Sequence, residues 1–172
     1  MTLSKAERKH IQLLSTKKGR KEQNLFLVSG IRLLEEAHHH RYVPELVLFA
    51  ESELTERGRT LLAAFRTKRL RIEPVSAREL GQLADTVSPQ GMAAVFSPRF
   101  LSFEELLKLP ARTSLVCENL SDPGNVGTLC RSALAFGCNV IVTIGATVEP
   151  FPRKLFAHQR ELSSACRLPI SA

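Results

Sequence analysis

Short apolar segments alternate with amphipathic segments along most of the chain. The apolar segments have the length and composition of buried strands, and they lie at residues 25–28, 45–50, 70–74 and 91–96. The segments between them carry apolar side chains at helical spacing, at residues 31–38, 53–67 and 76–83. Ser76 and Glu79 form a capping-box pattern at the start of the last one. This alternation predicts an α/β layer structure.

The same alternation returns after a connector at residues 98–112. We expect a strand at 114–117, a helix that ends at Phe136 with Gly137 as its C-cap, and a strand at 139–144. These elements form one right-handed βαβ unit. The chain therefore divides into a domain at residues 1–97, a linker at 98–112 and a second unit at 113–172.

The N-terminal segment carries most of the net charge of +7. We expect a helix that Gly19 ends, with one apolar face made by Leu3, Ala6, His10, Leu13 and Leu14. Seven basic residues lie between Met1 and Lys21, and Glu7 alone opposes them. This is either a solvated surface or a face that contacts phosphates. The second interpretation assigns phosphate contacts to Lys5, Lys9, Lys17, Lys18 and Arg20.

Several classes of protein are disfavoured. No apolar run approaches the length of a membrane span, and residues 1–20 have no apolar core of a signal peptide, so we expect a cytoplasmic protein without a membrane partner. The cysteines at 117, 130, 138 and 166 lack CxxC spacing, which favours reduced, core-filling thiols over structural zinc. Residues 38–40 are three histidines, but consecutive side chains on a helix point about 100° apart, which disfavours a shared metal ion.

Residues 122–127 (DPGNVG) separate the strand at 114–117 from the next helix. Ligands of open α/β sheets bind at the carboxyl ends of strands, and helix N-termini favour anions. An ordinary βα turn has the same spacing, and neither phosphate-binding fingerprint is present. Arg131 lies away from the predicted buried face, on the side of Thr128 and Gly124. It is either a surface arginine or one that reaches a phosphate. The predicted buried face comprises Val126, Leu129, Cys130, Ala133 and Leu134.

Residues 118–137 (ENLSDPGNVGTLCRSALAFG) resemble the first motif of the SpoU (TrmH-type) RNA 2′-O-ribose methyltransferases of the SPOUT class. Residues 17–21 (KKGRK), 26–32 (FLVSGIR), 88–91 (SPQG) and 93–96 (AAVF) are similar to the family's substrate-binding domain. The resemblance implies a ribosomal-protein-like α/β substrate-binding domain, followed by the N-terminal part of a SPOUT trefoil-knot α/β domain. It also implies S-adenosylmethionine as cofactor, rRNA or tRNA as partner, and a homodimer through a complete SPOUT domain.

Carried onto this chain, the motif implies catalytic roles for Asn125 and Arg131. Arg131 would engage the RNA and help to activate the ribose 2′-hydroxyl; because a guanidinium stays protonated, it would do so by positioning and electrostatic stabilisation rather than as a base. Asn125 would hold the loop or the ribose, and Glu118 would orient Arg131. Arg32, in the FLVSGIR segment, joins the RNA-binding residues.

The chain also departs from the family pattern. Ser29 stands where the family commonly has glutamate, and the match is poor after Pro150. Counterparts of the second and third motifs, which build the knot and most of the cofactor pocket, are not present. We therefore expect this 172-residue chain not to bind S-adenosylmethionine tightly or to methylate RNA, and its second unit to expose Val140, Val142 and Phe151. Two alternatives remain, namely a non-catalytic RNA-binding relative and an unrelated nucleotide-binding α/β enzyme.

Overall fold

The computed structural model describes residues 3–39, 41–84, 90–98, 104–105, 108, 113–138, 140–147 and 165–167. The chain divides into two compact units, Met1–Pro98 (unit 1) and Arg99–Ala172 (unit 2), and each is described by itself. Most of the predicted connector and nearly all of the chain beyond Thr147 lie outside the described residues.

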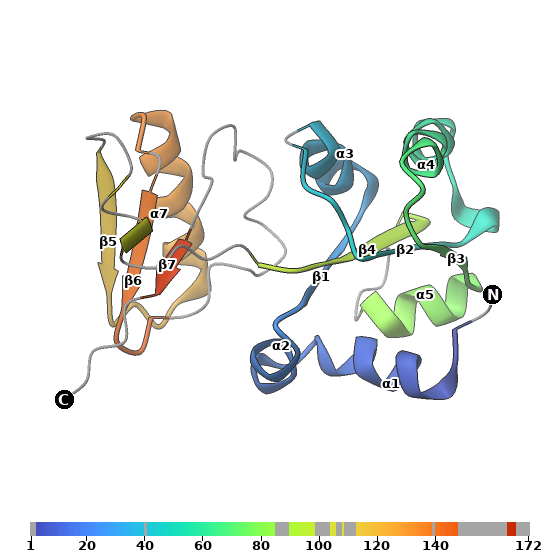
Figure 1. Cartoon of the computed structure of the whole chain (residues 1–172), viewed down its shortest axis with the longest axis horizontal. Helices are drawn as coiled ribbons and strands as arrows, with labels where there is room; N and C mark the ends of the chain where they lie inside the picture. Colours follow the sequence, from blue (N-terminus) through green and yellow to red (C-terminus); the bar gives the residue numbers. More distant parts are fainter. Residues whose placement is uncertain are drawn as a thin grey trace. The chain divides into compact units, whose positions relative to one another are not determined.

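Unit 1 is built on a four-stranded sheet with the strand order β1-β4-β2-β3 (Figure 1). The strands are β1 (Phe26–Ser29), β2 (Leu46–Phe49), β3 (Ile72–Pro74) and β4 (Met92–Phe96). Strand β2 is parallel to β3, whereas β4 is antiparallel to both β1 and β2. Every side chain of β2 and β4 is buried, so these two central strands are covered on both faces. This burial explains why they are continuous apolar runs rather than alternating ones.

Helices cover both faces of this sheet. In Figure 1, α3 (Ile31–His39) and α4 (Glu56–Thr67) lie on one face, and α1 (Lys5–Leu13) and α5 (Ala77–Ala84) lie on the other. A short 3-10 helix, η1 (Glu51–Glu53), precedes α4, and α2 (Lys17–Gln23) follows α1. The core on the side of α1 and α5 includes Leu3, Ile11, Leu14, Leu46, Leu48, Leu80, Leu83 and Val95. The predicted α/β layers are thus confirmed for unit 1.

The N-terminal helix differs from the prediction. It ends at Leu13, and α2 begins at Lys17, where the Thr16 hydroxyl accepts a hydrogen bond from Gly19 N at 3.0 Å. Gly19 therefore does not end a helix but lies buried in the first turn of the second one, against the Leu13 backbone. Within α1 the buried residue is Ile11, and three of the predicted core residues are exposed instead, namely Ala6, His10 and Leu13. The predicted stripe assumed one continuous helix, whereas Thr16 caps a new one.

A network of polar groups ties α1 to the edge strand β3. Ser4 and Glu7 form a capping box, in which Glu7 N donates to Ser4 Oγ at 3.2 Å and Ser4 N donates to Glu7 Oε2 at 2.8 Å. Arg71 Nη2 lies 2.6 Å from Glu7 Oε1, and Arg71 Nε donates to the buried Glu73 at 3.1 Å. The Ser4 backbone N–H, the Ser4 hydroxyl and the Arg71 guanidinium lower the pKa of Glu7 from 4.5 to about 2.

This lowered pKa predicts that unit 1 loses stability in acid. Because the carboxylate is favoured in the folded state, the contribution of Glu7 is complete above pH 4.5 and disappears as the pH falls toward 2. The urea midpoint at each pH can be followed by the fluorescence of Tyr42, the single tyrosine of the chain. Glu7→Gln should remove this part of the pH dependence, whereas Glu22→Gln, at an exposed glutamate, should retain it. A Glu7→Gln profile as steep as that of the wild type would contradict the assignment.

The described part of unit 2 includes a three-stranded sheet and the helix that joins its first two strands. The parallel strands β5 (Ser114–Glu118), β6 (Val140–Ile144) and β7 (Ala165–Arg167) have the order β5-β6-β7, and α7 (Pro123–Ala135) connects β5 to β6. Cys117, Val126, Cys130 and Ile141 form its buried cluster. Burial raises the pKa of the Cys130 thiol to about 11 and also raises that of Cys117, which fits the predicted core-filling role.

The expected exposure of the second unit is wrong for two residues. Val140 and Val142 are only 2% and 5% exposed, and Phe151 lies outside the described residues. Strand β7 pairs with the edge of β6 that is not bonded to β5, so the sheet is larger than the single βαβ unit that the sequence predicted. Among the described residues, no helix is both long and apolar enough to cross a membrane.

Candidate functional site

The carboxyl ends of β5 and β6 are cross-linked by the side chains of Asn119 and Thr147. Asn119 has a left-handed backbone (φ 53°), and its Oδ1 accepts a hydrogen bond from Ala146 N at 3.0 Å. The Thr147 hydroxyl lies 3.0 Å from the Cys117 carbonyl and 2.7 Å from the Ile144 carbonyl. It also accepts a hydrogen bond from Leu120 N at 3.3 Å. Ligands of open α/β sheets bind at this edge, and these two residues fix its shape.

Sequence reasoning missed Asn119 and Thr147 as structural residues of the site. The signal available for Asn119 is its place directly after a buried strand, where a left-handed residue is commonly asparagine or glycine. Thr147 carries no such signal, because its three partners lie near residues 117–120 and 144, which only the folded sheet brings together.

Helix α7 begins earlier than predicted. Its first residue is Pro123, so Gly124 and Asn125 lie in the first helical turn and not in a loop. Asp122 caps the helix, because its Oδ1 accepts a hydrogen bond from Gly124 N at 2.8 Å. The Asp122 carboxylate therefore already accepts a hydrogen bond from one of the backbone amides that were expected to bind an external anion. Asn125 is exposed.

Arg131 lies on the predicted side of α7. Its Nη2 donates to Thr128 Oγ1 at 2.9 Å, and Thr128 Oγ1 donates to the Gly124 carbonyl at 3.0 Å. These two bonds hold the half-buried Arg131 along the helix surface toward its N-terminus. Such a guanidinium presents several N–H donors in a fixed plane, which suits a phosphate or a developing negative charge on oxygen.

The remaining predictions for this helix have mixed outcomes. Val126, Cys130 and Ala133 are buried as predicted, but Leu129 is 38% exposed, and nothing is described of the Leu134 side chain. Glu118 is exposed at the end of β5. Within the described part of the chain, the hydrogen-bond partner of Arg131 is Thr128 and not Glu118. The orienting role of Glu118 therefore stays a prediction.

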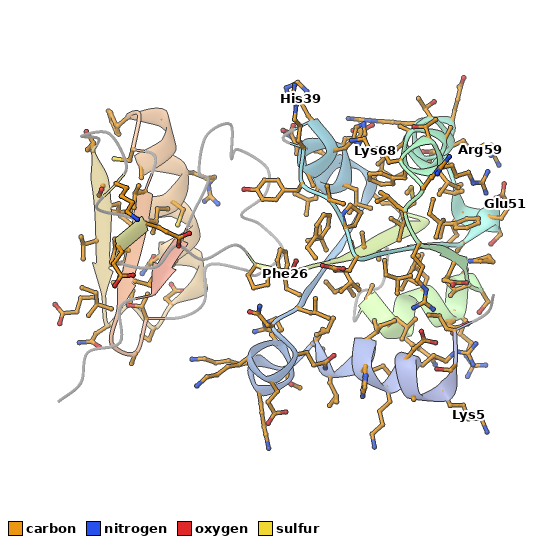
Figure 2. All side chains as sticks on the ribbon, viewed as in Figure 1. Lys5, Phe26, His39, Glu51, Arg59 and Lys68 are labelled. Atoms are coloured by element: carbon orange, nitrogen blue, oxygen red, sulfur yellow. The ribbon has the colours of Figure 1, made fainter. Side chains whose placement is uncertain are left out.

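The basic N-terminal segment presents to solvent all four lysines that were predicted to bind RNA. Lys5 and Lys9 are exposed one turn apart on α1, and Lys17 and Lys18 are exposed in the first turn of α2. Lys5 is labelled in Figure 2, where its side chain extends away from unit 1. Arg20 differs, because its Nη1 donates to the carbonyls of Leu14 and Ser15, at 3.0 Å each. Arg20 therefore closes the end of α1.

Arg32 does not lie with these lysines. It is exposed in the first turn of α3. Gly30, which directly precedes this helix, has a φ of 101°, and its N–H donates to the Met92 carbonyl at 3.0 Å. Helix α3 covers the sheet face opposite to α1 (Figure 1). The predicted RNA-binding residues thus occupy two faces of unit 1.

Comparisons with known proteins cover both units. The family model described as the MRM3-like substrate binding domain matches residues 6–94. The human mitochondrial rRNA methyltransferase 3 is 27% identical over 155 residues, which are 88% of this chain and 36% of that protein. The 23S rRNA (guanosine(2553)-2′-O)-methyltransferase RlmP of Bacillus subtilis is 30% identical over 142 residues, which are 82% of this chain and 52% of that protein. The chain thus spans about a third to a half of the length of these relatives.

A solved structure shows the same fold. The SpoU methyltransferase AviRb from Streptomyces viridochromogenes, in complex with the cofactor AdoMet, superposes with a TM-score of 0.74. The match covers 94% of this chain and 62% of that one, at 22% sequence identity. At this identity the likeness establishes the fold, and it extends over the α/β layers of both units.

Proposed function

The chain belongs to the family of MRM3-like substrate-binding domains, and from this premise we propose that unit 1 binds ribosomal RNA and that unit 2 supplies the α7 face of a SpoU-type 2′-O-methyltransferase site. One observation supports the proposal: the first two helices of unit 1 present five exposed lysines, and four of them, Lys5, Lys9, Lys17 and Lys18, are those that the sequence assigned to RNA. We propose rRNA rather than tRNA, because the relatives described above are named for rRNA. The interpretation as an unrelated nucleotide-binding enzyme is wrong, because the family match assigns unit 1 to a substrate-binding domain.

The four lysines are suited to contact the RNA backbone. Lys5 and Lys9 project from one helix, and Lys17 and Lys18 project from the start of the next. Lys18 forms a long ion pair with Glu22, at 3.8 Å, between two exposed side chains. Such a pair contributes little to stability, so it costs little to exchange it for a phosphate contact. Phosphate contacts of this kind position an RNA without reading its sequence.

A variant with Lys5, Lys9, Lys17 and Lys18 all replaced by glutamine is expected to bind rRNA with a weaker salt dependence. Each lost phosphate contact lowers the slope of log K against log salt by about 0.7–0.9, so four contacts lower it by roughly 3. Fluorescence anisotropy with a labelled rRNA fragment measures this slope. Arg20 is left unchanged, because it closes α1.

The matched control replaces the same four lysines by arginine, which retains the charge. Its slope should equal that of the wild type. An unchanged slope in the glutamine variant would return the segment to an ordinary solvated surface, and the RNA-binding part of the proposal would fail.

In the proposed methyl transfer, Arg131 binds a phosphate next to the target ribose and stabilises negative charge that develops on the 2′-oxygen. The guanidinium does not accept the hydroxyl proton, because it stays protonated in proteins. Thr128 is a positioning residue, since its hydroxyl holds the Arg131 fork at 2.9 Å. Asn125, exposed in the first turn of α7, is the proposed contact to the ribose.

S-adenosylmethionine is the methyl donor that we propose for the whole site, by analogy with the AdoMet complex of AviRb. Several polar groups of the described strand ends already have partners within the chain. The polar side chains of Asn119 and Thr147 are paired with the backbone of β5 and β6, and the Gly124 amide is bonded to Asp122. Arg131 and Asn125 therefore act on the RNA in this proposal.

A further inference from the structure

Helices α3 and α4 end beside each other in a group of basic side chains. We call this group the α3–α4 cationic patch, and it comprises His38, His39, Arg41, Lys68 and Arg69. Figure 2 labels His39 and Lys68 on these neighbouring helix ends. Lys68 Nζ lies 3.5 Å from His38 Nδ1, and the His38 ring packs edge-on against Phe65 with 5.3 Å between the ring centroids. The contact between His38 and Lys68 thus brings the ends of the two helices together.

Both arginines of the patch have a left-handed backbone. The φ angle is 60° at Arg41 and 54° at Arg69. Arg41 closes α3 in a Schellman motif, because Arg41 N donates to the His38 carbonyl at 3.0 Å and Tyr42 N donates to the Ala37 carbonyl at 2.9 Å. Glycine or asparagine adopts this backbone at a lower cost than arginine does. Strained positions that retain an unfavourable residue are often functional ones.

The two arginines of the patch differ from other arginines of unit 1 in their carboxylate partners. Arg57 pairs with Glu35, Arg59 with Glu51, and Arg71 with Glu7. Within the described residues, by contrast, neither the Arg41 nor the Arg69 guanidinium has a carboxylate partner. Burial lowers the pKa of His38, and the nearby Lys68 and His39 lower it further, so the charges around this ring are basic ones. A cluster of this kind favours an external anion.

We propose that the α3–α4 cationic patch binds phosphates of an RNA backbone at a site separate from the four lysines of α1 and α2. This inference rests on the RNA binding proposed above. Helices α3 and α4 lie on the sheet face opposite to α1 (Figure 1), so the two sites contact different stretches of RNA. Three of the four exposed groups of the patch are the cations of Arg41, Lys68 and Arg69, which suit phosphates.

The test is a variant with Arg41→Asn, Lys68→Gln and Arg69→Asn. Asparagine tolerates the left-handed backbone, so the helix ends should remain as they are. With a labelled single-stranded rRNA fragment, the slope of log K against log salt is expected to fall by about 2, since three contacts are lost at about 0.7 each. A control with Arg57→Gln, Arg59→Gln and Arg78→Gln removes the same charge from unit 1 outside the patch, and its slope should stay near that of the wild type. The conservative variant Arg41→Lys with Arg69→Lys should also retain the slope.

An unchanged slope in the patch variant overturns the proposal, as does an equal fall in the control. The two proposals fail in different ways. If the wild-type chain does not bind RNA, the proposed function fails; if the four-lysine variant loses slope and the patch variant does not, only the present inference fails. Circular dichroism of the patch variant shows whether a change in slope is due to unfolding. The variant Arg41→Lys with Arg69→Lys provides a second test, in which the charge is retained.

Discussion

Replacing Arg131 by alanine is expected to reduce methyl transfer about 10²–10³-fold, the usual loss for one donor that stabilises charge in a transition state. The fold should survive, because Arg131 lies opposite the buried side of α7 and its hydrogen bond goes to Thr128 within the same helix. The substitution removes a charged fork and leaves no buried partner without a hydrogen bond. The loss should therefore appear in the rate and not in stability.

The measurement is made on a fusion of residues 1–147 to the part of RlmP that follows its matching segment. The unmutated fusion is the reference. Arg131→Lys should recover only part of the rate, because an ammonium lacks the planar fork, and Thr128→Ala should cause a smaller loss than Arg131→Ala. Ser132→Ala, at the exposed neighbour, is the control and should leave the rate unchanged. Near-reference turnover with Arg131→Ala would exclude a catalytic role for this residue.

Replacing Gly19 by alanine is expected to destabilise unit 1 by about 1–3 kcal/mol, the usual cost of forcing a methyl group into a packed site. A Cβ atom at this position would lie 2.6 Å from the Leu13 carbonyl carbon and 2.9 Å from Leu13 Cβ. Since the carbonyl carbon is backbone, the contact can be relieved only by moving α1 and α2 apart. That movement would also separate Lys17 and Lys18 from Lys5 and Lys9, and we expect weaker RNA binding as a result.

The sign of this effect distinguishes packing from helix propensity. Propensity alone predicts that Gly19→Ala, inside a helix, raises stability by about 1 kcal/mol. Lys18→Ala is the control, because it changes the neighbouring residue of the same helix at an exposed side chain. Urea unfolding followed by Tyr42 fluorescence measures both variants. A higher midpoint for Gly19→Ala would show that the contact between α1 and α2 yields easily.

The elements that the sequence predicted well are those with a local pattern. Strands β2 and β4 are continuous apolar runs. Helix α5 begins directly after Ser76, whose hydroxyl accepts a hydrogen bond from Glu79 N at 3.2 Å as a cap does. Arg131 was placed correctly because the spacing of Val126, Cys130 and Ala133 alone defines the opposite face of α7. In each case the residues that determine the local structure are close together in the sequence.

The elements that were missed depend on contacts between distant residues. A glycine is typical of a helix end, and Gly19 was therefore predicted to end the first helix. Its packing against Leu13 instead makes it part of a second helix. The link from Thr147 to β5 joins residues that are far apart in the chain, and so does the pairing of β7 with β6 that enlarges the second sheet. Glu79 was predicted to complete a capping box, but its carboxylate pairs with Arg8 of α1. A local sequence pattern does not predict these contacts, because each of them involves a residue that is distant in the chain.

The strand order of unit 1 has a consequence for its synthesis on the ribosome. Strand β4 lies between β1 and β2 and bonds to both, yet it is the last of the four strands to be made. Until residue 96 has left the exit tunnel, β1 has no neighbour in the sheet and the apolar face of α3 has no complete surface to cover. Domains generally fold as units during translation, and the ribosome adds about 5–20 residues per second. The nascent N-terminal lysines are thus displayed for several seconds on a chain that has not yet closed its sheet, and folding is completed by the arrival of a single central strand.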